Sequence, residues 1–127
     1  MSGFESTILR VLACLCLPCM AQASGDVATI FAKCTGRLSA ELEHAWLMND
    51  TRADALMAQR AQFVAVLDAV MPQDNARSIL NTRIEAKLAH SAMLTTATFG
   101  NNPKLAKMAR AHASLRVRDC QSLLLGS

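Results

Sequence analysis

Tyrosine is absent from the 127-residue chain, which has one tryptophan, four phenylalanines, five glycines and three prolines. With these residues scarce, the chain is dominated by residues such as alanine, leucine, methionine, arginine and glutamine, which lose little side-chain freedom on entering a helix. The net charge is only +3, whereas dedicated nucleic-acid binding would call for a dense basic stripe with interleaved aromatic rings. The composition therefore favours a helical protein that does not bind nucleic acid.

The chain also lacks an apolar run long enough to span a bilayer. The run from Val11 to Met20 has about ten residues, and roughly twenty are needed. It follows Arg10 and precedes Ala21-Gln22-Ala23, and this pattern is typical of a secretory signal peptide. We therefore expect residues 1–23 to be removed and residues 24–127 to form one periplasmic or secreted domain with no stable membrane span.

Removal of the signal peptide leaves few cysteines. Three of the five precede the expected cleavage site, including the Cys16-Leu17-Pro18-Cys19 motif, so Cys34 and Cys120 remain. An oxidising compartment favours a disulfide between them, and two buried free thiols are the alternative.

Apolar residues recur at helical spacing in four segments of the mature chain, with turn signals between them. We predict helices over residues 26–48, 51–71, 74–99 and 103–125. Their expected inward faces carry Val27, Ile30, Phe31, Cys34, Leu38 and Ala45; Leu56, Phe63, Leu67 and Val70; Leu80, Ile84, Leu88 and Leu94; and Leu105, Ala109, Ala113, Val117, Cys120 and Leu124.

Helices of similar length with short connections predict an all-α, up-down-up-down four-helix bundle. The first and fourth helices are antiparallel neighbours in such a bundle, so Cys34 and Cys120 fall near one end and one disulfide joins the two helices. Gly36 lies inside the first predicted helix, where glycine costs about 1 kcal/mol relative to alanine. A close approach of the fourth helix at the disulfide would explain this glycine.

Four polar side chains are expected at nearly one level of the bundle, namely Glu41, Arg60, His90 and His112. The structural interpretation is a Glu41–Arg60 ion pair near the core. Facing helices of bundles also build metal sites from carboxylates and imidazoles. The alternative function is therefore a metal- or small-ligand-binding bundle that uses Glu41, His90 and His112, and a third possibility is an anion pocket on Arg60 and the histidines.

Two surface features are candidates for partner contacts. The fourth helix carries basic residues opposite its apolar face, namely Lys104, Lys107, Arg110 and Arg118. Trp46 and Leu47 project away from the core face of the first helix, and aromatic residues are enriched at interfaces. These residues form either an ordinary solvated surface and helix end or a docking site for a protein or an anionic envelope partner.

Catalytic motifs are absent from the sequence. It has no glycine-rich phosphate loop, no G-x-S-x-G, no H-E-x-x-H and no C-x-x-C-H haem motif. The prediction is therefore a non-enzymatic binding or accessory protein without a cofactor.

The stretch from Phe31 to Met48, FAKCTGRLSAELEHAWLM, resembles small secreted proteins of alphaproteobacteria. The resemblance extends to Arg83-Ile84-Glu85-Ala86-Lys87 and to the late cysteine. It implies a periplasmic setting, but the family has no known activity, so the resemblance assigns no site residue.

Overall fold

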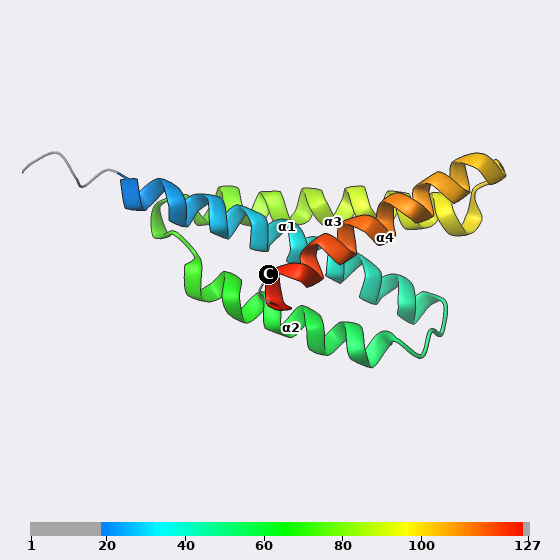
Figure 1. The fold of residues 1–127 in the computed structure, drawn as a ribbon, viewed down its shortest axis with the longest axis horizontal. Helices are drawn as coiled ribbons and strands as arrows, with labels where there is room; N and C mark the ends of the chain where they lie inside the picture. Colours follow the sequence, from blue (N-terminus) through cyan, green and yellow to red (C-terminus); the bar gives the residue numbers. More distant parts are fainter. Residues whose placement is uncertain (1–18, 126–127) are drawn as a thin grey trace, which may run out of the picture.

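The computed structural model describes residues 19–125, with side chains from residue 25 onward. It contains α1 (Cys19–Leu47), α2 (Ala53–Val70), the short 3-10 helix η1 (Gln73–Asn75), α3 (Ala76–Phe99) and α4 (Pro103–Leu125) (Figure 1). The all-α class is thus confirmed. The predicted signal peptide lies outside the described residues, except for its last residues, which begin α1. No helix in the described part is long and apolar enough to cross a membrane.

The helices alternate in direction along the chain, so α1 and α3 run one way and α2 and α4 run back (Figure 1). The most extensive interface joins α1 to α3, followed by α1 with α2 and α3 with α4. Direct packing of α1 on α4 is limited by comparison. The predicted bundle is confirmed, and within it α1 is the central helix.

The disulfide between Cys34 and Cys120 is confirmed and joins α1 to α4, with a Cα–Cα distance of 5.5 Å. Both cysteines are buried, as their places on the predicted inward faces require. Because α4 has few other contacts with α1, this bond is its main attachment to the central helix.

Gly36 lies at a close approach of α1 to α3, rather than to α4 as the sequence suggested. A Cβ atom at position 36 would overlap the carbonyl oxygen of Arg83 and lie 2.9 Å from the backbone nitrogen of Lys87. It would also lie 3.2 Å from the Cβ of Ala86. The absence of a side chain at this position lets the two backbones touch, which explains why α1–α3 is the principal interface.

The core is divided into three clusters, and α1 contributes to each of them. The buried members are Cys34, Leu38, Leu42, Ala45, Leu56, Phe63 and Cys120 in the first cluster; Ala28, Ala32, Leu67 and Ile79 in the second; and Ala40, Leu94 and Ala113 in the third. Phe31 packs against Phe63 with ring centroids 5.6 Å apart. Small side chains dominate the α1 surface because neighbouring helices cover it on several sides.

The predicted inward faces are correct for α2 and partly wrong for the other three helices. On α3, Leu80, Ile84 and Leu88 are 44%, 54% and 63% exposed, whereas the helix buries Ile79, His90, Leu94 and Ala97. Val27, Ile30 and Leu105 are likewise exposed. The physical reason is the close α1–α3 contact, which turns the small-residue side of α3 inward and leaves its large apolar stripe outside.

Candidate functional site

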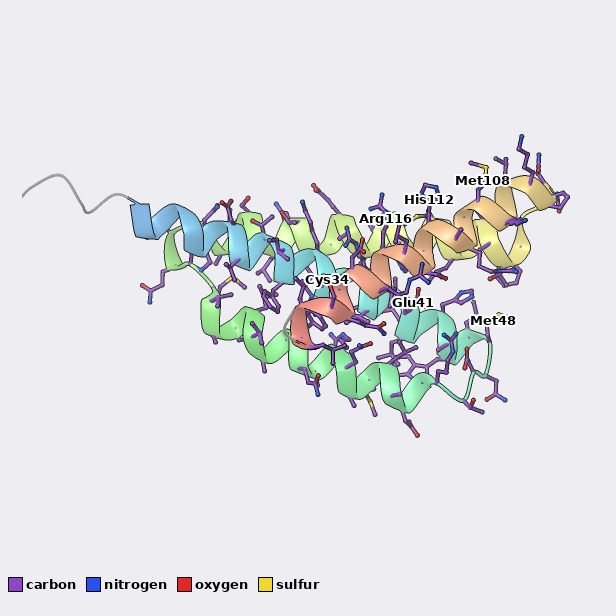
Figure 2. The ribbon with its side chains drawn as sticks, viewed as in Figure 1. Cys34, Glu41, Met48, Met108, His112 and Arg116 are labelled. Atoms are coloured by element: carbon purple, nitrogen blue, oxygen red, sulfur yellow. A yellow bond between two sulfur atoms is a disulfide. The ribbon has the colours of Figure 1, made fainter. Side chains whose placement is uncertain are left out.

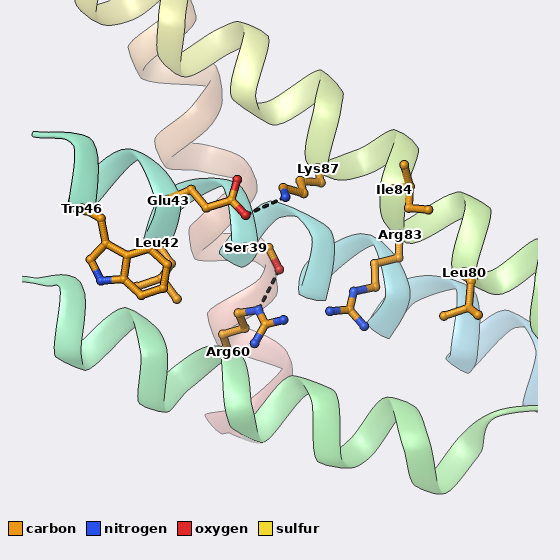
Figure 3. A pocket seen from close by; sticks show the side chains of 9 residues that line it. All are labelled: Ser39, Leu42, Glu43, Trp46, Arg60, Leu80, Arg83, Ile84 and Lys87. Atoms are coloured by element: carbon orange, nitrogen blue, oxygen red, sulfur yellow. Dashed lines mark hydrogen bonds and ion pairs between the residues drawn. The ribbon is translucent and has the colours of Figure 1, made fainter.

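A groove opens between α2 and α3, with α1 as its floor (Figure 3). We call it the α2–α3 groove. Its volume is about 480 Å³, within the range of pockets that hold ligands or peptide side chains. Its lining consists of Ser39, Leu42, Glu43 and Trp46 from α1, Arg60 from α2, and Leu80, Arg83, Ile84 and Lys87 from α3.

The groove exists because α2 and α3 each pack extensively on α1 but not on each other. The contact at Gly36 brings α3 down onto α1 and directs Leu80 and Ile84 toward the space beside α2. The stripe that the sequence assigned to the core therefore forms one wall of an open groove.

The charged residues of the groove are unequally paired. The Nζ of Lys87 lies 2.6 Å from the Oε1 of Glu43, so these two charges offset each other. Arg60 donates its Nε–H to the hydroxyl oxygen of Ser39 at 2.8 Å, and that hydroxyl donates to the carbonyl of Thr35. Arg60 is thereby held by a neutral partner, which does not offset its charge.

Arg83 faces the groove beside Arg60 (Figure 3). Burial lowers the pKa of the Arg83 guanidinium, and the charge of Arg60 lowers it further, with Asp68 acting in the opposite direction. Neither arginine forms an ion pair within the described part of the chain. Two guanidinium groups without carboxylate partners beside an apolar wall favour an occupant that is both apolar and anionic.

Trp46 lies at one end of the groove and is 58% exposed. The following residues Leu47 and Met48 are also exposed, at 70% and 46%. The outward projection that the sequence indicated for Trp46 and Leu47 is therefore present, and Trp46 is continuous with the groove. Their contact with a partner stays a prediction.

The predicted polar layer is arranged differently from the sequence interpretation. The Glu41–Arg60 ion pair is wrong, because the Oε1 of Glu41 lies 2.7 Å from the Nε2 of His90 instead. Ser39 and Glu41 are two residues apart on α1 and so point to different sides of the helix. Arg60 binds at Ser39 on the α2 side, while Glu41 meets His90 of α3.

The structure brings together only two of the three residues of the metal hypothesis. His90 is almost completely buried against Glu41, whereas His112 is exposed on α4, on the same edge of that helix as Met108 and Arg116 (Figure 2). Among the described residues, no group of three histidine, cysteine or acidic side chains is placed to hold a metal ion. Arg60 belongs to α2 and His90 belongs to α3, and they contact different sides of α1. The anion pocket that both were expected to form is therefore absent from the described part of the chain.

The basic residues of α4 are exposed, as expected for Lys104, Lys107, Arg110 and Arg118. Arg110 has a structural contact, because its Nη2 donates to the carbonyl of Ala97 at 2.8 Å. That carbonyl belongs to the last turn of α3, where backbone acceptors lack helical partners. Arg110 therefore caps α3, and the partner role of this basic face stays a prediction.

No family model matches the chain, and no curated protein or solved structure is significantly similar to it. The resemblance to secreted alphaproteobacterial proteins stays a prediction.

Proposed function

We propose that the protein is a non-enzymatic periplasmic binding protein that receives an acidic, amphipathic helix of a partner protein in the α2–α3 groove. The observation that carries this proposal is the pairing of an uncovered apolar stripe with two unpaired arginines in one groove. The Trp46 end of the molecule, which the sequence already indicated, forms part of this surface.

The apolar wall supports a helical occupant. Leu80, Ile84 and Trp46 keep about half of their surface exposed in the free protein. Full burial of an exposed side chain of this kind gains about 1.5–3 kcal/mol, so covering the remaining half of each gains about half of that. Amphipathic helices obtain this energy by laying an apolar face into a groove between the helices of their partner.

The dimensions support two turns of such a helix. The groove residues of α3 run from Leu80 to Lys87 and those of α1 from Ser39 to Trp46. Seven helical steps correspond to about 10.5 Å, which matches anchors at positions i, i+3 or i+4, and i+7 of a guest helix. An acidic residue beside these anchors would reach Arg60 or Arg83 with charge-assisted hydrogen bonds.

Trp46 supplies a direct test because it is the chain's only tryptophan. The mature protein would be titrated with a synthetic helical peptide that has leucines at i, i+4 and i+7 and flanking glutamates. We expect saturable binding with a blue shift of the Trp46 emission, because the guest helix removes water from the indole. The matched peptide with lysines in place of the glutamates should bind at least tenfold more weakly.

Two pairs of variants separate the groove from general surface effects. Ile84→Ser should weaken binding about tenfold, whereas Leu115→Ser, which removes a side chain of nearly equal exposure on α4, should not. Arg83→Gln should weaken binding, whereas Arg77→Gln at an exposed position of α3 should leave it unchanged. Equal effects within each pair, or self-association through the groove seen by sedimentation, would contradict the proposal.

A further inference from the structure

A second hollow lies between α1, α3 and α4, away from the α2–α3 groove. We call it the basic cleft, and its volume is about 280 Å³. Its charged lining residues are Lys33 and Arg37 from α1, Glu85 from α3 and Arg116 from α4, and the buried His90 also lines it. Three cations therefore meet one carboxylate at a place where three helices converge.

The cations of the basic cleft outnumber the carboxylate that lines it and form no direct ion pair with it. Burial lowers the pKa of the Arg37 guanidinium, and the nearby charge of Arg116 lowers it further, while Asp119 acts in the opposite direction. Arg37 donates an Nη1–H to the Sγ of Cys120 at 3.6 Å, a weak acceptor that carries no charge. Within the described residues, none of Lys33, Arg37 and Arg116 forms an ion pair.

His90 provides a second and independent observation. Its Nε2 is engaged by Glu41 at 2.7 Å, whereas its Nδ1 is buried and has no hydrogen-bond partner among the described residues. A buried polar atom without a partner lowers the stability of the fold, because its hydrogen bond to water is lost and not replaced. Such atoms are rare in folded proteins and call for a specific explanation.

A phosphate group explains both observations. It offers anionic oxygens to the guanidinium groups, for which bidentate hydrogen bonds are the preferred geometry. Because the second pKa of a phosphate monoester is about 6, it carries acceptor oxygens near neutral pH and, in its singly protonated form, a hydroxyl as well. It can therefore supply the hydrogen-bond partner that the Nδ1 of His90 lacks.

We propose that the basic cleft binds the phosphate group of a small soluble phosphate monoester. Arg37 and Arg116 hold the anionic oxygens from two different helices, Lys33 adds positive charge at the rim, and His90 supplies the remaining hydrogen bond. Glu85 also lines the cleft, so its carboxylate disfavours ligands that carry more negative charge than one phosphate group. This site is independent of the α2–α3 groove and does not rest on the function proposed for it.

The test is calorimetric titration of the mature, disulfide-bonded protein with glycerol 3-phosphate and with inorganic phosphate at constant ionic strength. We expect saturable 1:1 binding and a higher Tm in the presence of either ligand. Arg116→Gln should weaken binding at least tenfold, because it removes a charge-assisted contact. Arg118→Gln, a matched change on the same helix outside the cleft, should alter the affinity by less than twofold.

Two results would overturn the proposal. The first is the absence of saturable binding of both ligands at millimolar concentration. The second is an equal loss in the two arginine variants, which would show only general attraction of anions to a basic protein. His90→Gln provides a further readout: this change should reduce affinity while the circular dichroism spectrum of the same variant shows that its helices are intact.

Discussion

Gly36→Ala tests the packing of α1 on α3, which determines the shape of the molecule. In most helices this change is favourable, because alanine is about 1 kcal/mol better than glycine in a helix interior. Here the added methyl group would overlap the carbonyl oxygen of Arg83 and press on the Lys87 backbone and the Ala86 side chain. Two of these three neighbours are backbone atoms, which cannot move by a change of rotamer.

The magnitude follows from the balance of these two effects. Inserting a methyl group into a closely packed contact costs typically 1–3 kcal/mol, and more where the backbone must shift. Relief requires α1 and α3 to separate, which loosens the largest interface in the protein. Because the added Cβ meets backbone atoms, we take the cost at about 3 kcal/mol or more, and the helix-propensity gain of about 1 kcal/mol offsets part of it. We therefore expect a net loss of about 2 kcal/mol or more in the free energy of unfolding, or a fall in Tm of roughly 10 °C for a domain of this size.

The assay is urea and thermal denaturation followed by circular dichroism at 222 nm, with Gly25→Ala as the matched control on the same helix. No atom lies within 4 Å of a Cβ placed at position 25, so the control should be neutral or slightly stabilising. A Gly36→Ala protein as stable as the control would refute the close approach of the two helices. In the double variant with Ala86→Gly, only part of the loss should be recovered, because the carbonyl of Arg83 remains in the way.

Three further measurements test the remaining features of the fold. Replacing Cys34 and Cys120 by alanine removes a disulfide between residues with a sequence separation of 86. By the chain-entropy estimate, the free energy of unfolding should fall by about 4–5 kcal/mol, and an unchanged denaturation midpoint would contradict this. Asn102→Ala removes the side-chain oxygen that accepts the Lys104 and Leu105 amides at 3.0 and 3.1 Å, and should cost about 1 kcal/mol in the same denaturation assay. Hydrogen bonds from Arg52 lower the pKa of the Asp50 carboxyl, so Asp50 stabilises the fold at neutral pH and loses this contribution as the pH falls below about 4. The deficit of Asp50→Asn in urea titrations should therefore be present at pH 7 and smaller at pH 2, and an equal deficit at both values would refute this linkage.

The elements of the fold were predictable because their signals are local. Pro72 follows the end of α2, and Asn102 caps α4 just before Pro103. The disulfide followed from counting, since the expected mature chain holds only Cys34 and Cys120. Neither inference depends on how far a helix is rotated about its own axis.

The rotation of α3 was not predictable from its large apolar residues. Leu80, Ile84 and Leu88 form a regular stripe, but hydrophobic periodicity does not detect a helix–helix contact made of small residues. The informative residue was Gly36, because a glycine inside a helix indicates that another backbone comes close. The helix that approaches Gly36 could not be identified from one sequence, since α3 and α4 both pass near α1.

The polar residues were misassigned for the same geometric reason. Glu41 and Arg60 were placed at one level of the bundle, and the level alone did not determine which neighbour each side chain faces. Ser39, two residues before Glu41, takes Arg60 instead, and Glu41 turns toward His90. Side chains two residues apart point about 200° apart around a helix. Ser39 therefore contacts α2, whereas Glu41 contacts α3.

This division makes the two proposed sites separable by reduction of the disulfide. The α2–α3 groove is built from α1, α2 and α3, whereas the basic cleft needs Arg116 of α4 and an Arg37 that bonds to Cys120. Because packing between α1 and α4 is otherwise limited, reduction should loosen α4 and leave the contact at Gly36 in place. The reduced protein should therefore retain peptide-induced changes in Trp46 emission and lose most of its phosphate affinity. Equal loss of both activities would show that α4 supports the whole fold and that the two sites are not independent.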